Sequence, residues 1–133
     1  MSKKLDFREY ECELIKVVDG DTIDCWIDLG FKVKWKARVR YMGLDTWESR
    51  TRDLEEKKKG LAAKARTKEL LEKVSSKSGY FRIKSYGLGK YGRVLADIFI
   101  QNKKGENICI NEVLLKEGHA YTYEGGKKKE FTS

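Results

Sequence analysis

The first third of the chain alternates between apolar and polar residues in three successive runs. Residues 10–18 are rich in β-forming side chains and lead into a turn with the sequence Asp-Gly-Asp-Thr at 19–22. Apolar residues then occupy every second position over 23–29 and again over 35–41. A period of two residues is typical of strands that bury one face. The pattern therefore predicts three β-strands before residue 42.

The pattern then changes to a helical period. Apolar or small residues from Ala63 to Val74 recur three or four positions apart, which predicts a helix that begins at about Leu61. The charged stretch 49–60 before it is predicted to be a loop, and residues 75–79 are expected to end the helix.

The last part of the chain predicts further strands and a second helix. Two runs, 80–86 and 93–100, indicate strands, and a short strand is expected around Ile108. The final helix is predicted to begin with Asn111 as its N-cap and to end at Gly118.

Three strands, a helix, two strands and a helix predict a mainly β, α+β fold. This order suits a five-stranded Greek-key barrel of the OB type with two helices packed on it, although many α+β domains share the order. The length predicts one domain over 1–133, with its core at about 10–122. The basic tail 123–133 is expected to be frayed.

Charge narrows the classes of partner. The chain carries 29 Lys and Arg against 21 Asp and Glu, a formal charge of +8. A small basic domain most often meets polyanions, because Lys and Arg displace counterions from phosphates. The polar face of the third predicted strand is wholly cationic: Lys34, Lys36, Arg38 and Arg40. Such a face is also an ordinary solvated surface, so it does not by itself identify a site.

The hydropathy and the cysteine pattern of the sequence indicate the cellular compartment of the protein. No apolar run approaches the roughly 20 residues that span a bilayer, and the first residues lack the apolar core of a secretory signal. Three scattered cysteines without a CxxC pair suit free thiols and argue against zinc. We therefore expect a cytoplasmic protein with no membrane partner, unless this chain has lost a leader.

Three polar clusters follow strand-like runs: "VVDGDT" (17–22), "RYMGLDTWE" (40–48) and "KYGRVLA" (90–96). Carboxylates from two strand ends could share one hard cation such as Ca²⁺, which binds oxygen ligands. Arginine forks match phosphate bidentately, and a free glutamate can activate water. Each cluster alone reads more simply as a turn or a solvated face; their joint occurrence favours a catalytic site.

Together these motifs resemble the staphylococcal nuclease (thermonuclease-like) family over about 14–121. The resemblance rests on the motifs DGDT, R-x4-D-T-x-E and KYGR in this order, together with the helical segments "AAKARTKELL" and "NEVLLKEGHA". The resemblance implies an OB-fold nuclease that hydrolyses DNA and RNA with one Ca²⁺ and leaves 3′-phosphate and 5′-hydroxyl ends. We expect single-stranded or unpaired substrate to be preferred, and a monomer.

The resemblance also implies roles for individual residues. Asp21, Asp45 and the carbonyl of Thr46 would bind calcium, and Asp19 would support them from behind. Glu48 would act as the general base, while Arg40 and Arg93 would grip the scissile phosphate. The residues implied in nucleotide binding are Lys90, Tyr91, Tyr121 and Tyr123.

Two departures from the family pattern stand out. Trp47 replaces the proline that the family usually has between Thr46 and Glu48, and the family's last long helix is shortened or missing. The alternative function is a non-catalytic module that binds single-stranded nucleic acid, as relatives that lost their acidic ligands or an active-site arginine do. The enzyme is favoured by five retained residues: Asp21, Asp45, Glu48, Arg40 and Arg93.

Overall fold

The alternating runs of the sequence form the strands of a barrel. A computed structural model describes residues 8–47 and 52–122. The five barrel strands are β1 (Arg8–Asp19), β2 (Thr22–Gly30), β3 (Val33–Tyr41), β5 (Tyr80–Leu88) and β6 (Val94–Gln101). Each agrees with its predicted run to within two residues.

The barrel closes through one parallel pair. The strands follow the order β3-β2-β1-β5-β6 with antiparallel neighbours, and β3 then pairs with β6 in parallel, with Val39 opposite Val94. Inward-facing residues such as Ile23, Val39 and Ile98 are fully buried. This closed five-stranded mixed barrel with two helices confirms the predicted OB-type fold.

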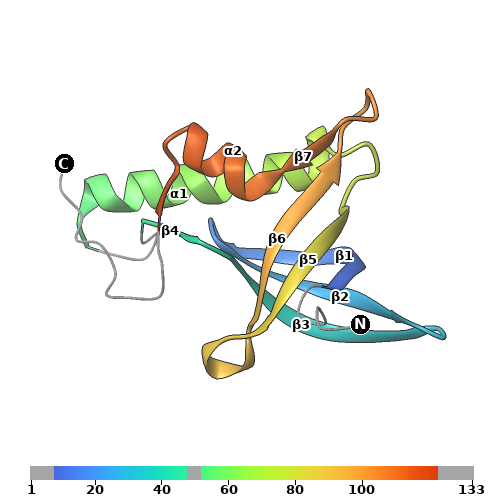
Figure 1. Ribbon diagram of the computed structural model, residues 1–133. Coiled ribbons are helices and arrows are strands. Elements are labelled where there is room, and N and C mark those ends of the chain that lie inside the picture. Colours follow the sequence, from blue (N-terminus) through green and yellow to red (C-terminus); the bar gives the residue numbers. More distant parts are fainter. Residues whose placement is uncertain (1–7, 48–51, 123–133) are drawn as a thin grey trace.

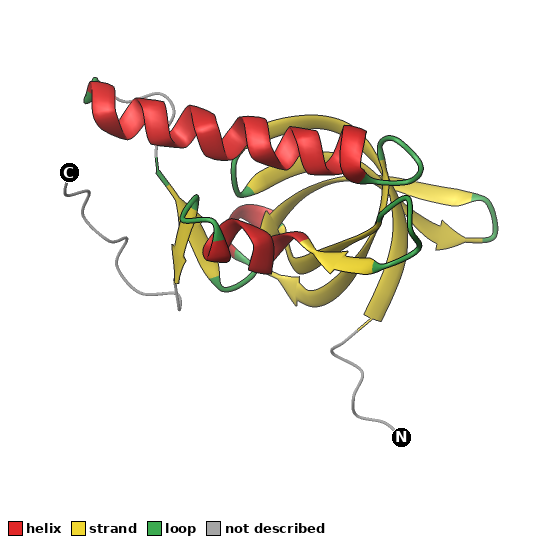
Figure 2. Ribbon diagram, turned by 90° about the horizontal axis from the view of Figure 1, so that it is seen from above, coloured by secondary structure: helices red, strands yellow, loops and turns green. Residues whose placement is uncertain are grey.

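Two helices cover the same side of the barrel (Figures 1 and 2). Helix α1 (Leu54–Glu69) continues into one π-helical turn, η2 (Leu70–Val74), and the short helix α2 (Ile110–Lys116) lies beside it. Neither is long and apolar enough to span a membrane, and this holds for every helix in the described ranges.

The predicted loop at 49–60 is wrong for its second half, because α1 already begins at Leu54. The side chain of Asp53 accepts hydrogen bonds from the backbone N–H groups of Glu55 and Glu56, at 3.0 and 3.1 Å. This is an N-cap, and the two glutamates in the first turn favour the positive end of the helix dipole. Residues 49–51 of that stretch lie outside the described residues.

The predicted cap of α2 is also wrong. Cys109 occupies the N-cap position, and Asn111 lies inside the first turn with a buried side chain. Its amide oxygen accepts from Ile98 N–H at 2.9 Å, and its amide nitrogen donates to the Met42 carbonyl at 3.0 Å. Asn111 therefore ties α2 to β6 and to the turn after β3. The helix ends at Lys116 with Glu117 as its C-cap, two residues before Gly118, where the sequence predicted its end.

Short elements complete the fold. β7 (Asn107–Cys109), predicted around Ile108, pairs with β6. The sequence gives no sign of β4 (Leu44–Thr46) or β8 (Ala120–Thr122), which form a separate two-stranded sheet. The predictions of a frayed tail over 123–133 and of a shortened last helix lie outside the described residues.

Candidate active site

The β1–β2 turn brings Asp21 under helix α1. Gly20, just before it, packs so closely that an added Cβ would lie 2.7 Å from the Cβ of Ala63 and 3.1 Å from the Thr46 side chain. The Thr67 hydroxyl of α1 donates to the Gly20 carbonyl at 2.9 Å. The turn is thus held against the helix, and Asp21 follows at a fixed position with 5% of its surface exposed.

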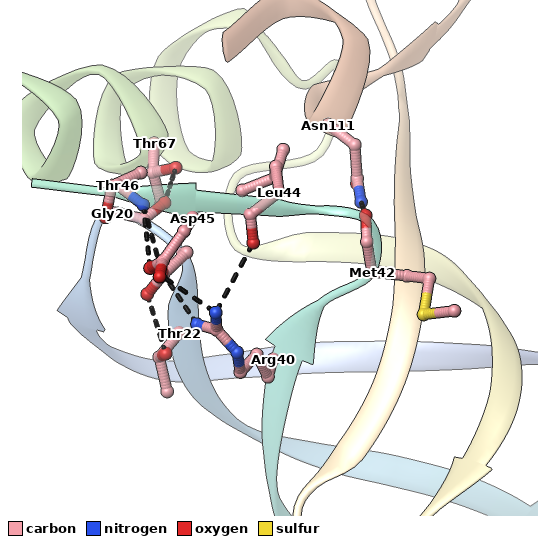
Figure 3. Close-up of polar contacts among 10 residues, drawn as sticks. Gly20, Thr22, Arg40, Met42, Leu44, Asp45, Thr46, Thr67 and Asn111 are labelled. Carbon is pink, nitrogen blue, oxygen red and sulfur yellow. Dashed lines mark hydrogen bonds and ion pairs between the residues drawn. The ribbon is translucent and has the colours of Figure 1, made fainter. Parts of the chain in front are cut away.

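Arg40 enters the same place from the end of β3. It pairs with Thr22 across β2–β3, so both side chains lie on one face of the barrel wall. Its guanidinium group lies 2.7 Å from an Asp21 carboxylate oxygen and 3.3 Å from one of Asp45. A longer contact, 3.4 Å, reaches the Leu44 carbonyl (Figure 3).

β4 supplies the second acid. Asp45 and Thr46 are both buried, and the backbone N–H of Thr46 donates to carboxylate oxygens of Asp21 at 3.2 Å and of Asp45 at 3.0 Å. β8 holds β4 in place, with Tyr121 opposite Asp45. Two strand ends that lie 24 positions apart in the chain therefore present their carboxylates to one guanidinium group.

The charges of this cluster stabilise one another. Burial would raise the pKa of Asp21, but its hydrogen bond with Asp45, the charge and hydrogen bond of Arg40, and the Thr22 hydroxyl together lower that pKa below its ordinary value. Burial would lower the pKa of Arg40, but the charge of Asp21, with a smaller contribution from Asp45, raises it. Asp21 therefore stays ionised although it is buried.

The cluster forms the wall of an open pocket of about 250 Å³. Its lining residues are Asp19, Asp21, Thr22, Arg40, Asp45, Thr46, Trp47 and Arg93. Six of these are among the predicted site residues, and they come from both halves of the chain. The lining holds three carboxylates and two guanidinium groups, so the pocket is net negative when all are ionised.

Arg93 reaches the pocket because of the parallel β3–β6 pair. It precedes Val94, which lies opposite Val39, so Arg93 and Arg40 sit near the same closing edge of the barrel. Its Nε donates to the Lys90 carbonyl at 3.3 Å, and its guanidinium group lies 5.8 Å from the Tyr91 ring centroid. Lys90 and Tyr91 form the adjacent 3₁₀ turn η3 (Lys90–Gly92) and do not line the pocket.

The remaining predicted residues differ in their placement. Tyr121 is buried behind Asp45, and burial followed by the charges of Asp45 and Asp21 raises its pKa to about 12. Its ring meets Trp47 edge-on at 4.7 Å between centroids. Glu48 and Tyr123 lie outside the described residues.

Sequence reasoning missed two lining residues, Thr22 and Trp47. In the sequence, Thr22 was noted only as the last residue of the turn motif Asp-Gly-Asp-Thr. In the structure its hydroxyl donates to a carboxylate oxygen of Asp21 at 2.9 Å. Trp47 was noted as a departure from the family pattern without a role, and its position beside Tyr121 required the unpredicted β4–β8 sheet.

The donors in the pocket suit a hard cation. The side-chain groups in the lining that could bind a metal ion are the carboxyl and hydroxyl oxygens of Asp19, Asp21, Thr22, Asp45 and Thr46. Within the described ranges, no three Asp, Glu, His or Cys side chains cluster closely enough to hold a metal on their own. Asp21 and Asp45 therefore fit an ion that takes its other ligands from backbone carbonyls, water or substrate, as Ca²⁺ and Mg²⁺ do.

A comparison with protein-family models identifies the family. The model described as staphylococcal nuclease homologue matches residues 38–133, which include Arg40, Asp45 and Arg93 but not Asp21. No curated protein matches the chain. With most of its length matched and an OB-type barrel around the pocket, the chain belongs to the staphylococcal nuclease homologue family, and its function is that of a nuclease or a related nucleic-acid protein.

Proposed function

We propose that this protein is a calcium-dependent nuclease that hydrolyses the phosphodiester bonds of DNA and RNA. The observation that carries the proposal is the convergence of Asp21 and Asp45 on Arg40, in a pocket that Arg93 also lines. A protein that only binds nucleic acid gains nothing from burying two acids where a polyanion must approach, because like charges repel. A site for metal-assisted hydrolysis needs both signs of charge together.

Arg40 and Arg93 bind the scissile phosphate. Each guanidinium group offers several N–H donors in a planar fork, so Arg40 can keep its contacts to Asp21 and still donate to phosphate oxygens. Both groups remain charged at any working pH. Their positive charge stabilises the transition state, in which the phosphorus gains a fifth oxygen, more than it stabilises the bound substrate. This difference in stabilisation lowers the activation barrier.

Asp21 and Asp45 would hold one Ca²⁺, together with the carbonyl of Thr46, and Asp19 would support the site from the pocket wall. When bound, the ion would neutralise phosphate charge and help to orient the reacting groups. Thr46 N–H and the Thr22 hydroxyl fix the orientation of the carboxylates, because they donate to oxygens that would otherwise rotate.

Glu48 is the proposed general base. It takes a proton from a water molecule, the water oxygen forms a bond to phosphorus, and the bond from phosphorus to the 5′-oxygen breaks. The leaving oxygen takes a proton from solvent, so the products are a 3′-phosphate and a 5′-hydroxyl. Single-stranded substrate is favoured because its backbone can enter a pocket of this size.

The neighbouring nucleotide is assigned to the η3 side of the pocket. Lys90 and Tyr91 are exposed next to Arg93 and would bind a terminal phosphate. Tyr121 supports Trp47 from behind, and Tyr123 is proposed to contact the base on the strength of the family resemblance.

Digestion of plasmid DNA and of RNA in Ca²⁺, in Mg²⁺ and in a chelator tests the proposal. We expect cleavage of both substrates in Ca²⁺ and none in chelator, with 5′ ends that polynucleotide kinase labels without prior phosphatase treatment. Retarded bands without digestion in any ion would instead favour a binding module. Cleavage in Mg²⁺ alone would overturn the choice of cofactor.

A further inference from the structure

We infer that the outer wall of β2 and β3 is a second nucleic-acid-binding face, which takes unpaired nucleotides that extend beyond the pocket. The inference rests on the proposed nucleic-acid substrate. It assigns phosphates to the cations of β3 and a base to Trp26.

The first observation is the row of cations that leads away from the pocket. Lys34, Lys36 and Arg38 occupy alternate positions of β3 on the face that carries Arg40, and all three are exposed. From Lys34 to Arg40 the strand rises about 20 Å at about 3.4 Å per residue. The row therefore begins at the tip of the β2–β3 hairpin and ends at the phosphate-binding arginine of the pocket.

The cations remain available to a ligand. Arg38 forms two hydrogen bonds with Asp24, at 2.8 and 3.1 Å, and nearly half of its side-chain surface stays exposed. A guanidinium group has five N–H donors, so three remain. Within the described ranges no ion pair is formed by Lys34 or Lys36.

The second observation is an exposed aromatic ring beside these lysines. Trp26 on β2 lies opposite Lys36 and is 40% exposed, although large aromatic side chains are usually much more deeply buried. In the part of the chain that the structure describes, Trp26 makes no ring–ring or cation–π contact. Its ring can therefore stack with a base, an interaction that tolerates any sequence.

The third observation is the polarity across this face. One row of paired residues runs over four strands: Lys36, Trp26, Glu13 and Tyr80. Trp26 and Tyr80 flank a shallow hollow of about 70 Å³, which Cys12, three carboxylates (Glu11, Glu13 and Asp28) and Lys34 also line. Carboxylates repel phosphate but accept hydrogen bonds from base amino groups. The face is thus cationic along β3, where a backbone would lie, and aromatic and mainly acidic in the hollow, where bases would lie, with Lys34 at the border between the two.

This arrangement distinguishes nucleic acid from an acidic protein segment. An acidic protein segment would be repelled by the carboxylates in the hollow. A nucleotide strand presents its negative phosphates on one side and the amino groups of its bases, which donate hydrogen bonds, on the other. The continuity with Arg40 adds a direct route into the pocket.

Binding of a labelled single-stranded oligonucleotide of about 16 nucleotides, the upper end of an OB-fold site, tests the inference in chelator, where cleavage cannot proceed. The double variant Lys34→Gln/Lys36→Gln should reduce the slope of log affinity against log salt by about 1.4, the value for two lost contacts to a single strand. The matched control is Lys103→Gln/Lys104→Gln, which removes the same charge from the exposed β6–β7 loop and should leave the slope nearly unchanged.

Trp26→Ala should weaken the same binding roughly ten- to hundredfold, and Trp26→Phe should restore most of it. Equal affinities and salt slopes for the β3 double variant and its control, with no effect of Trp26→Ala, would overturn the inference. The same variants assayed for Ca²⁺-dependent cleavage of a dinucleotide, which reaches only the pocket, should keep the wild-type rate.

The two proposals can fail separately. If the wild type cleaves but the face variants bind the long strand normally, the second face is disproved and the nuclease stands. If the wild type never cleaves but the face variants bind weakly, the nuclease is disproved and the face stands.

Discussion

Two buried carboxylates share one guanidinium group in this pocket. Arg40 contacts Asp21 at 2.7 Å and Asp45 at 3.3 Å, with 13% of its side chain exposed. An isolated buried carboxylate is costly, so Arg40 stabilises the fold, in addition to the part in phosphate binding that we propose for it. A variant that removes the charge of Arg40 would therefore affect both stability and activity. A variant that keeps the charge can separate the two effects.

Arg40→Lys should lower kcat about 10²–10³-fold while the protein stays folded. Lysine keeps the positive charge but cannot donate to two carboxylates and to phosphate in one plane. Steady-state cleavage and a circular dichroism melt measure the two effects. Arg82→Lys, at an exposed position on β5, is the control and should retain the wild-type kcat; an Arg40→Lys enzyme as fast as this control would contradict the role of Arg40.

The lowered pKa of Asp21 predicts an acid-dependent loss of stability. Its ionised form is stabilised in the folded state, so its contribution is fully present above the pKa of an unfolded aspartate. The contribution is lost as the pH falls through the lower pKa of the folded state. Urea unfolding of wild type and Asp21→Asn, from neutral pH to about pH 2, should show a difference in unfolding free energy that shrinks across this acidic range. A difference that stays constant with pH would disprove the shift.

At the scale of elements, the site depends on how closely the β1–β2 turn approaches α1. The small residues Gly20 and Ala63 meet where a single extra methyl group would lie 2.7 Å from its neighbour. Thr67 then bonds the Gly20 carbonyl and lies 3.3 Å from the Tyr41 hydroxyl, which links the helix to two strands.

Gly20→Ala should therefore lower the free energy of unfolding by about 1–3 kcal/mol, the usual cost of overpacking. Chemical denaturation measures it. In the double variant Gly20→Ala/Ala63→Gly the clash is removed, so the two changes should be less than additive in a double-mutant cycle. Strict additivity would mean that the two residues do not meet.

Asn111 plays a comparable part in the second helix, α2. Asn111→Ala leaves the Ile98 N–H and the Met42 carbonyl without their buried partner, and should cost about 2–3 kcal/mol of unfolding free energy. The exposed Asn107 on β7 provides the control, since Asn107→Ala should change stability by less than about 0.5 kcal/mol. Equal losses of unfolding free energy for the two substitutions would contradict the structural role of Asn111.

The long elements could be predicted because each has a period of its own. β2 and β3 have nine residues each and alternate over 23–29 and 35–41, and that pattern alone locates them. β4 and β8 have three residues each and gain their order from pairing with one another, which no local pattern records. The start of α1 was missed because residues 54–60 are almost wholly polar, and only the Asp53 cap marks the boundary.

At the scale of the whole molecule, the pocket joins three segments that the sequence keeps apart. The resemblance of the motifs to the nuclease family implied that Asp21, Arg40, Asp45 and Arg93 form one site, and all four line one pocket. The structure adds what spacing could not contain: Arg40 lies in contact with both acids, and the parallel β3–β6 pair brings Arg93 to them. The assignments of calcium ligands and of the general base remain predictions.

The charge of the whole chain differs from the charge of the pocket lining. The net positive chain attracts a polyanion, whereas the pocket itself is lined by three carboxyl groups beside its two guanidinium groups. Under the proposed function a metal is needed for cleavage but not for capture of the strand, so binding in chelator and cleavage in calcium report on separate parts of the protein.

The most direct test of the central claim is the rate at which wild type and Asp21→Asn cleave a single-stranded oligonucleotide in Ca²⁺. Asp21 was outside the matched family region, so its part in the site rests on its contact with Arg40 and its place beside Asp45. We predict that the wild type cleaves and that Asp21→Asn is slower by about 10²-fold or more, while Asp53→Asn, which keeps a competent N-cap, is unaffected. Wild-type rates for a folded Asp21→Asn protein would contradict the account.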